Sequence, residues 1–215
     1  KSAVVHHKNE YINQRGELVG ALTNYFFHVE REASEKKGKN LNVEHPQYDS
    51  DYLAKIDEAY SSEYVRGAEP RYWEDVSVSE QLPSIVRGPL CVTDIICWHI
   101  GNGFGQFNVG PLRAAYRNRM KAPNFYTQNE YGAWDAAQRV HWDPLRAKRV
   151  GNPRPYDYGR MRTQWMMQLV GNWMGDDGWL FRHSDQIRKF NYIGDTSWVH
   201  GKVVGKRLEG IHHMV

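Results

Sequence analysis

The sequence contains little cysteine and no long apolar run. Cys91 and Cys97 are the two cysteines among 215 residues. Their spacing is not the C-x-x-C spacing of zinc and redox sites, and the apolar run around them predicts two reduced thiols in the core. No stretch approaches the roughly 20 apolar residues of a membrane helix, and no charged-then-apolar leader opens the chain. These absences argue against a disulfide scaffold and a membrane protein, and we expect a cytoplasmic location.

A large charge of one sign is absent as well. The 28 Lys and Arg residues nearly balance 25 Asp and Glu residues, so the formal net charge is +3, which argues against a nucleic-acid partner. Basic residues nevertheless cluster in 113–121 and 146–162, whereas 44–80 is rich in acids. Such basic segments suit a small phosphorylated ligand such as a nucleotide or coenzyme A, and a solvated face is the alternative interpretation.

Several motifs of known chemistry are missing. Residues 101–105 (GNGFG) lack the G-x-G-x-x-G spacing of a dinucleotide-binding loop, and no G-x-S-x-G or Cys-His signature marks a covalent nucleophile. The histidine pairs at 6–7 and 212–213 would point to opposite faces of a strand, so we predict no metal site. His99 lies in an apolar run, where we expect a core histidine or the wall of an active site.

Aromatic residues, by contrast, are plentiful. Eight Trp, 13 Tyr and 7 Phe supply large, stiff side chains, which excludes a disordered tail and predicts an aromatic-rich interior. The length fits one domain, or one domain and a fragment of another.

The first forty residues predict a β-hairpin. Residues 3–13 and 18–31 are rich in β-branched and aromatic residues, and 14–17 (QRGE) between them has the composition of a turn. A hairpin alone is marginally stable in water. This one must therefore pair with a sheet elsewhere in the chain, or with a segment outside it.

A connecting region follows. Residues 33–42 (ASEKKGKNLN) are polar and lack an apolar period, which predicts a solvated linker. Asp49 or Ser50 can then cap a helix, in which apolar residues recur at helical spacing. These residues are Leu53, Ile56, Ala59 and Tyr60. We interpret 41–70 as a helical linker that packs on a domain surface.

The remainder, 71–215, predicts one long helix wrapped by an antiparallel sheet, an α+β pattern. Residues 71–86 alternate like two strands and a turn, and 90–100 is an apolar helix or buried strand. The segment 161–174 has the strongest helical period and ends at the turn 175–178. We expect two or three strands between 179 and 210.

A family resemblance enters at 140–162 (VHWDPLRAKRVGNPRPYDYGRMR). This segment resembles the D-x-N-P-x-H-x-D, alanine-bearing short helix and G-x-x-x-P-x-x-x-G elements of MaoC-like acyl dehydratases, which have the hotdog fold. The matching residues are His141, Asp143, Pro144, Ala147, Gly151, Pro155 and Gly159. Residues 188–207 resemble the family's strand, P-x-x-x-G-D turn and strand, with Asn191 in place of proline.

The resemblance implies a tandem, double-hotdog protein. The hairpin at 1–40 resembles the last two strands of a hotdog domain, so it ends a preceding repeat or closes the sheet of this one. Residues 41–70 would link the repeats, and 71–215 would form a MaoC-like hotdog domain truncated near its C-terminal end. An unpaired sheet edge then favours homo- or hetero-oligomers.

The activity that the resemblance implies is addition or removal of water across the 2,3 double bond of an acyl-CoA thioester. His141 would be the acid/base, and the N–H of Gly159 would bind the thioester oxygen. The family's aspartate position, five residues before the histidine, is Ala136 here. Asp135 is the nearest replacement, and Asp143 and Asp157 are further candidates.

Binding of the substrate would use basic and aromatic residues, and no cofactor beyond the substrate's own coenzyme A is implied. Trp165 and Trp173 line an acyl tunnel or pack in the core. The candidates for the phosphate groups are Arg113, Arg117, Arg119, Lys121, Arg160 and Arg162. Two alternatives stay open: a non-catalytic repeat that shapes the acyl pocket of a partner, and a hotdog thioesterase.

Overall fold

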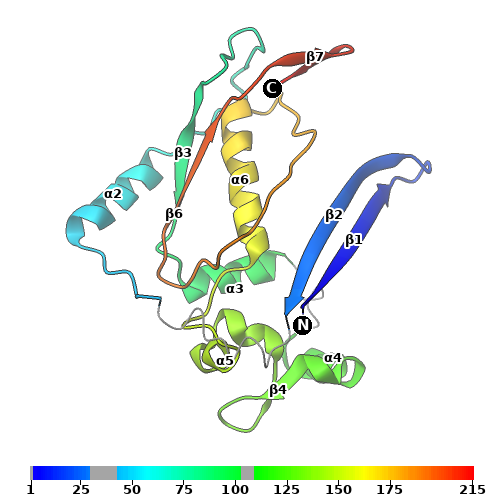
Figure 1. Cartoon of the computed structure of the whole chain (residues 1–215), viewed down its shortest axis with the longest axis vertical. Coiled ribbons are helices and arrows are strands. Elements are labelled where there is room, and N and C mark those ends of the chain that lie inside the picture. Colours follow the sequence, from blue (N-terminus) through cyan, green and yellow to red (C-terminus); the bar gives the residue numbers. More distant parts are fainter. Residues whose placement is uncertain (1, 30–42, 103–108) are drawn as a thin grey trace.

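The computed structural model describes residues 2–29, 43–102 and 109–215 (Figure 1). It is a mixed α+β structure with antiparallel strand pairs, as the sequence predicts. The elements are β1 (Ser2–Ile12), β2 (Leu18–Val29), α2 (Ser50–Ser61), β3 (Gln81–Arg87), α3 (Val92–Gly101), α4 (Leu112–Lys121), η2 (Pro123–Phe125), β4 (Tyr126–Gln128), β5 (Trp134–Ala136), η3 (Ala137–His141), α5 (Pro144–Arg149), α6 (Gly159–Met174), β6 (Ser197–Lys202), β7 (Arg207–Glu209) and β8 (His212–Met214).

The predicted N-terminal hairpin is confirmed. β1 and β2 pair along their whole length around a tight turn in which Gly16 has a φ of 80°, a conformation that glycine adopts without strain. Apolar side chains remain exposed on both of its faces, since Tyr25 and Phe27 lie on one and Tyr11 and Phe26 on the other. In the described part of the chain, neither strand pairs with a third.

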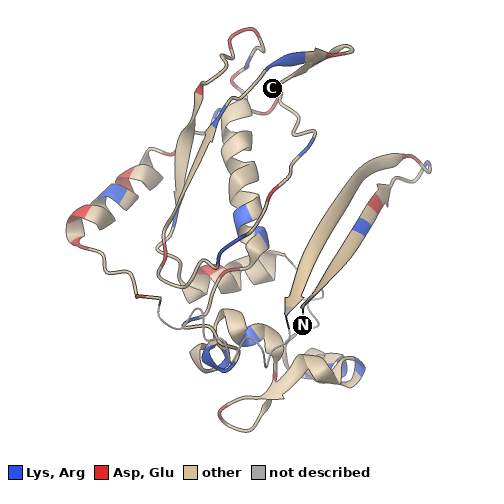
Figure 2. Ribbon diagram, in the orientation of Figure 1, with Lys and Arg blue, Asp and Glu red and all other residues tan. Residues whose placement is uncertain are grey.

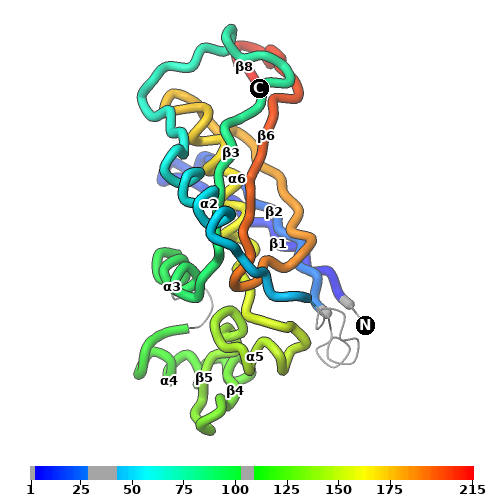
Figure 3. Tube along the Cα trace, turned by 90° about the vertical axis from the view of Figure 1, so that its left-hand side faces the viewer, coloured from blue at the N-terminus to red at the C-terminus, as the bar shows by residue number. Residues whose placement is uncertain are grey.

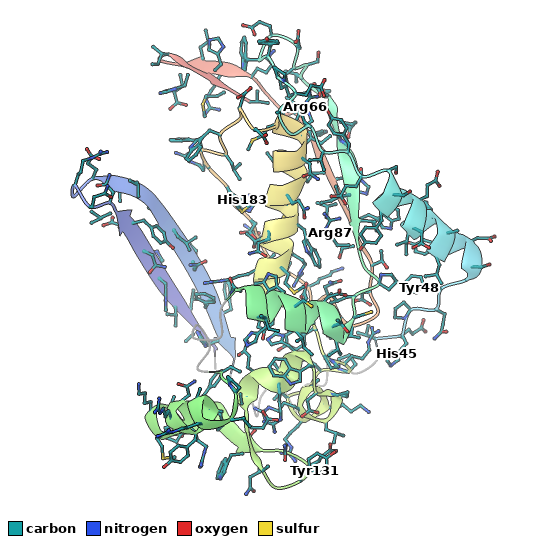
Figure 4. All side chains as sticks on the ribbon, turned by 180° about the vertical axis from the view of Figure 1, so that it is seen from behind. His45, Tyr48, Arg66, Arg87, Tyr131 and His183 are labelled. Atoms are coloured by element: carbon teal, nitrogen blue, oxygen red, sulfur yellow. The ribbon has the colours of Figure 1, made fainter. Side chains whose placement is uncertain are left out.

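The helix predicted to begin at Asp49 or Ser50 is also confirmed, as α2. The Asp49 carboxylate accepts a hydrogen bond from the Tyr52 N–H at 2.7 Å and caps the helix. Ile56 is buried, and the Trp198 indole of β6 donates to the Tyr52 hydroxyl at 3.0 Å. Before the helix, the Tyr48 hydroxyl donates to the Gly194 carbonyl at 2.8 Å (Figure 4). The helix is therefore attached to the sheet by specific contacts.

β3 and β6 form the strand pair between α2 and α6 (Figures 1 and 3). α6 covers one face of this pair. Leu169 and Trp173 of α6 pack against Leu82 and Ile85 of β3, together with Val76 and Val203. This cluster is the larger of the two hydrophobic cores, and it holds the C-terminal half of α6 against the sheet.

The N-terminal end of α6 belongs to a second core. Tyr158 and Met161 pack there with Leu90 and with Ile95 of α3. α3 begins at Val92, so the apolar run at 90–100 is a helix rather than a strand. The second core holds the first turn of α6 against α3, near η3 and α5.

Two predicted strand regions are wrong. Residues 71–80 form turns instead, because the Glu80 carboxylate binds the Ser77 N–H and the Trp173 indole. Residues 179–190 run irregularly along α6, where Asp185 accepts from Thr163 and Ile187 lies over Gly159. These local contacts take the place of a strand ladder.

The predicted burial of the cysteines is wrong too. Cys91 and Cys97 are free thiols, and both are exposed. Cys91 is the N-cap residue of α3, and Ile95 and His99 form the buried side of that helix. The cysteines are exposed because α3 buries only the side that carries Ile95 and His99, and both cysteines lie outside that side.

α6 is less covered than the sequence predicts. Three of its residues, Met161, Leu169 and Trp173, are fully buried. The sheet against it has two strands in the described residues, so the hotdog arrangement and the boundaries at 40 and 70 stay predictions. The predicted linker at 33–42 and the last three residues of the run at 101–105 lie outside the described residues. None of the described helices has the length and apolar character needed to span a membrane.

Candidate active site around His141

His141 ends η3 and lies buried, with 8% of its surface exposed. Its Nδ1 is 2.7 Å from the carbonyl oxygen of Tyr156. A carbonyl can only accept, so Nδ1 carries the hydrogen and donates it. In the neutral ring the other nitrogen, Nε2, then has a lone pair that can accept a proton.

The imidazole is held between aromatic rings. The Tyr158 ring stacks on it, with centroids 3.9 Å apart, and the Tyr156 ring meets it edge-on at 4.8 Å. Tyr158 is the N-cap residue of α6. The stacking therefore places the imidazole beside the first turn of the central helix.

Burial lowers the pKa of His141 to about 4. The charge of a protonated His99 acts in the same direction, and the hydrogen bond to the Tyr156 carbonyl opposes both. His141 is consequently neutral at pH 7, with the tautomer set by Tyr156. The imidazole is therefore unprotonated and able to accept a proton above about pH 4, but its lowered pKa makes it a weaker base than an ordinary histidine.

The ring of His99 also lies near Tyr158, with ring centroids 5.7 Å apart. It is buried, as one of the two sequence interpretations predicts, and burial lowers its pKa. Its Nδ1 is 3.1 Å from the Tyr158 hydroxyl. His99 also lines a small apolar cavity of about 160 Å³, together with Ile96, Ile100, Val109 and Trp142.

Gly159 is the first residue of α6. No carbonyl within the helix can accept its N–H, and the helix dipole places partial positive charge there. A Cβ at this position would lie 3.4 Å from Ile187, which is ordinary packing distance. Neither a positive φ nor a steric clash therefore requires a glycine at this position.

Asp135 does not contact His141 in the described interactions. It lies in β5, half-buried, and its carboxylate is 3.9 Å from the Arg139 guanidinium and accepts from the Ala136 N–H. Ala136 itself is buried, and its carbonyl accepts from Arg139. The structure therefore pairs Asp135 with Arg139. No described contact between Asp135 and His141 supports the choice of Asp135 as the partner of His141.

Arg139 organises the segment that carries His141. It is 2% exposed, and it donates to four carbonyl groups, those of Thr127, Gln128, Asp135 and Ala136. Its Nε also donates to Asp143 at 3.0 Å. Asp143 in turn caps α5 through the Leu145 and Arg146 N–H groups. Asp143 is accordingly a helix cap that also anchors Arg139.

Asp157 is the most buried of the candidate carboxylates. Its side chain has no exposed surface, and it pairs with Arg162, whose Nε lies 2.8 Å away. The Asn191 amide donates to it at 3.3 Å. Burial raises its pKa to about 6, against the opposite effect of Arg162 and Asn191.

The predicted substrate-binding residues fall into separate places. Arg160 is exposed on the first turn of α6, and Trp165 is half-buried one turn further on. Trp165 lines a groove of about 450 Å³ with Trp98, Cys91 and Cys97. Trp173 belongs to the core instead.

One of the predicted arginines of α4 lies against β5. Arg117 is exposed, and Arg119 lies over the Trp134 ring at 5.2 Å. No described contact joins them to Arg160 or Arg162. Figure 2 shows Lys and Arg on α4 and α5 at the lower end of the molecule and on the first turn of α6 above them.

Sequence reasoning did not single out Tyr156 and Tyr158. Their alternation in PYDYG just before the helix was a usable signal, because it places two aromatic rings on one side of an extended segment that leads into Gly159. Both are buried enough that their pKa values rise to about 12. They are neutral donors and stacking surfaces at pH 7.

No family model matches the chain, and no curated protein sequence matches it. The MaoC-like resemblance of 140–162 and 188–207 therefore stays a prediction. Over residues 2–29, 43–102 and 109–215, no three His, Cys, Asp or Glu side chains lie close enough together to hold a metal ion.

Proposed function

We propose that this chain is a hydratase or dehydratase that adds water to, or removes it from, the 2,3 double bond of an acyl-CoA thioester. The observation that carries the proposal is the stacking of a neutral His141, with Nδ1 engaged, on the N-cap residue of α6. It brings a proton acceptor next to a helix N-terminus. The resemblance of 140–162 to MaoC-like dehydratases supports the same chemistry.

In the hydration direction, His141 Nε2 accepts a proton from water as the water oxygen bonds to C3. Electrons move through the double bond onto the thioester oxygen, which accepts a hydrogen bond from the Gly159 N–H. The enolate then takes the proton from His141 at C2, and the thioester carbonyl is restored. The imidazole returns to its neutral form, so the reaction balances.

The experiment is hydration of crotonyl-CoA by wild type and by His141→Asn. The asparagine amide can still donate to the Tyr156 carbonyl but lacks the Nε2 base, so we expect a loss of at least ~10²-fold in kcat. His200→Gln is the matched control, because His200 is exposed on β6 and its Nδ1 bonds Ser84. Equal rates for wild type and His141→Asn would contradict the proposal.

A second candidate is a non-catalytic repeat that shapes the acyl pocket of a partner. It is favoured by the engagement of Asp135 with Arg139 and by the buried Ala136 at the family's acid position. Tight binding of an acyl-CoA together with no hydration by wild type would support it. Release of free coenzyme A thiol, by contrast, would indicate a thioesterase.

A further inference from the structure

The peptide bond between Tyr156 and Asp157 is held from both sides. Its carbonyl oxygen accepts from His141 Nδ1 at 2.7 Å, and its N–H donates to the Asn191 carbonyl at 2.9 Å. One rigid peptide plane therefore joins the candidate base to the segment after 190. Any rotation of this plane would move the acceptor that sets the tautomer of His141.

The side chain of Asp157 adds further contacts that hold the Tyr156–Asp157 peptide plane in place. Its Oδ1 accepts from Arg162 Nη2 at 3.1 Å, and its Oδ2 lies 2.8 Å from Arg162 Nε and accepts from the Asn191 amide. Arg162 also donates to the Lys189 carbonyl at 2.6 Å. The residues before α6, the first turn of α6 and the segment 189–191 are thus joined around one carboxylate.

Stability alone explains this arrangement poorly. Asp157 has no exposed side-chain surface, and a buried ion pair is often no more stable than an apolar replacement of similar volume. Arg162 and Asn191 offset a desolvation cost that an uncharged residue would not have. What the pair supplies is orientation, since its hydrogen bonds define one position for the peptide plane.

We propose that Asp157 is a positioning residue for His141, acting with Arg162 and Asn191 through the Tyr156 carbonyl to keep the imidazole in the Nδ1–H tautomer. Arg162 is then part of this framework rather than a phosphate ligand. The inference rests on the proposed function for its catalytic consequence, whereas the tautomer itself can be measured without any substrate.

The first readout is ¹⁵N NMR of histidine-labelled protein at neutral pH, which distinguishes the two neutral tautomers. Wild type should show His141 in the Nδ1–H form. Asp157→Asn keeps the shape but removes the charge, and it should give a mixture of tautomers. Glu63→Gln is the matched control, because it breaks the partly buried Glu63–Arg87 pair, whose guanidinium bonds measure 2.7 and 2.8 Å.

The second readout is the split between kcat and KM for crotonyl-CoA. We expect Asp157→Asn to lower kcat by about 10-fold, less than the loss of the base itself, with KM little changed. Glu63→Gln should change neither value. If Asp157→Asn does not fold, Arg162→Lys keeps the charge but loses the two-point contact, and it should shift the tautomer in the same direction.

An Nε2–H tautomer in wild type would overturn the inference. So would an unchanged Nδ1–H tautomer in whichever of Asp157→Asn and Arg162→Lys folds. A tautomer that depends on Asp157 in a protein without hydratase activity would leave the positioning role intact and refute the proposed function. The two ideas therefore fail separately.

Discussion

The imidazole of His141 stacks on the phenol ring of Tyr158, with ring centroids 3.9 Å apart and an angle of 28° between the planes. The two residues belong to different elements, η3 and the N-cap of α6. This contact joins the segment that Arg139 organises to the central helix.

Stability should depend on pH through two buried groups with opposite effects. Burial raises the pKa of Asp157 from 3.8 to about 6, so the folded protein binds the proton more tightly and loses stability as pH rises through 6. Burial lowers the pKa of His141 from 6.5 to about 4, so its contribution is present above 6.5 and lost as pH falls towards 4. Each effect amounts to roughly 3 kcal/mol.

Single variants separate these effects. Between about pH 4 and pH 7, Asp157→Asn should gain roughly 3 kcal/mol of unfolding free energy relative to wild type, and His141→Asn should lose a similar amount. Urea unfolding at several pH values measures both. Variants whose stability stays parallel to that of wild type across this range would show that the two pKa values are unshifted.

Asp135→Asn should have little effect on hydration. The carboxylate is 38% exposed and pairs with Arg139 at 3.9 Å, so we expect less than about a 10-fold change in kcat, below the usual effect of a general acid or base. The unfolding free energy should fall by no more than about 1 kcal/mol. A loss as large as that of His141→Asn would restore Asp135 as the catalytic partner.

Two tryptophans of α6 should behave differently. Trp173 is buried in the larger core, so Trp173→Ala should cost about 3–5 kcal/mol of unfolding free energy. Trp165 is half-buried beside a groove of about 450 Å³, so Trp165→Ala should cost roughly 1–2 kcal/mol. If the groove holds the acyl chain, Trp165→Ala also raises KM for long acyl-CoA more than for crotonyl-CoA. Equal changes for both substrates would assign Trp165 to packing alone.

The hairpin should promote self-association. Phe27 is 76% exposed and Tyr25 63% exposed on one face of a strand pair whose outer edges have no described partner. We therefore expect oligomers in sedimentation, and a shift towards monomer in Tyr25→Lys/Phe27→Lys. A stable monomer of the unmodified chain would contradict this expectation.

Elements that depend on neighbours in sequence could be predicted. The hairpin predicted from the β-branched and aromatic residues on either side of 14–17, the Asp49 cap of α2, the period of α6 and the turn at Gly175 all appear in the structure where the sequence places them. Their hydrogen bonds close over a few residues, so the local sequence contains what is needed to specify them. Burial of His99 followed from the same kind of local pattern.

Strand pairing and the site contacts were decided by the tertiary structure. β3 pairs with β6 across more than a hundred residues. The residues at 71–80 and 179–190, which the sequence predicts as strands, form none, because a strand needs a partner edge as well as a suitable sequence. Asp135 is the right residue type and lies one position before the family's aspartate position, yet in the structure it pairs with Arg139. Residue types established which chemistry is possible here, whereas the folding of η3 against Tyr156 and Tyr158 determined which nitrogen of His141 is available, because that depends on a carbonyl fifteen residues away.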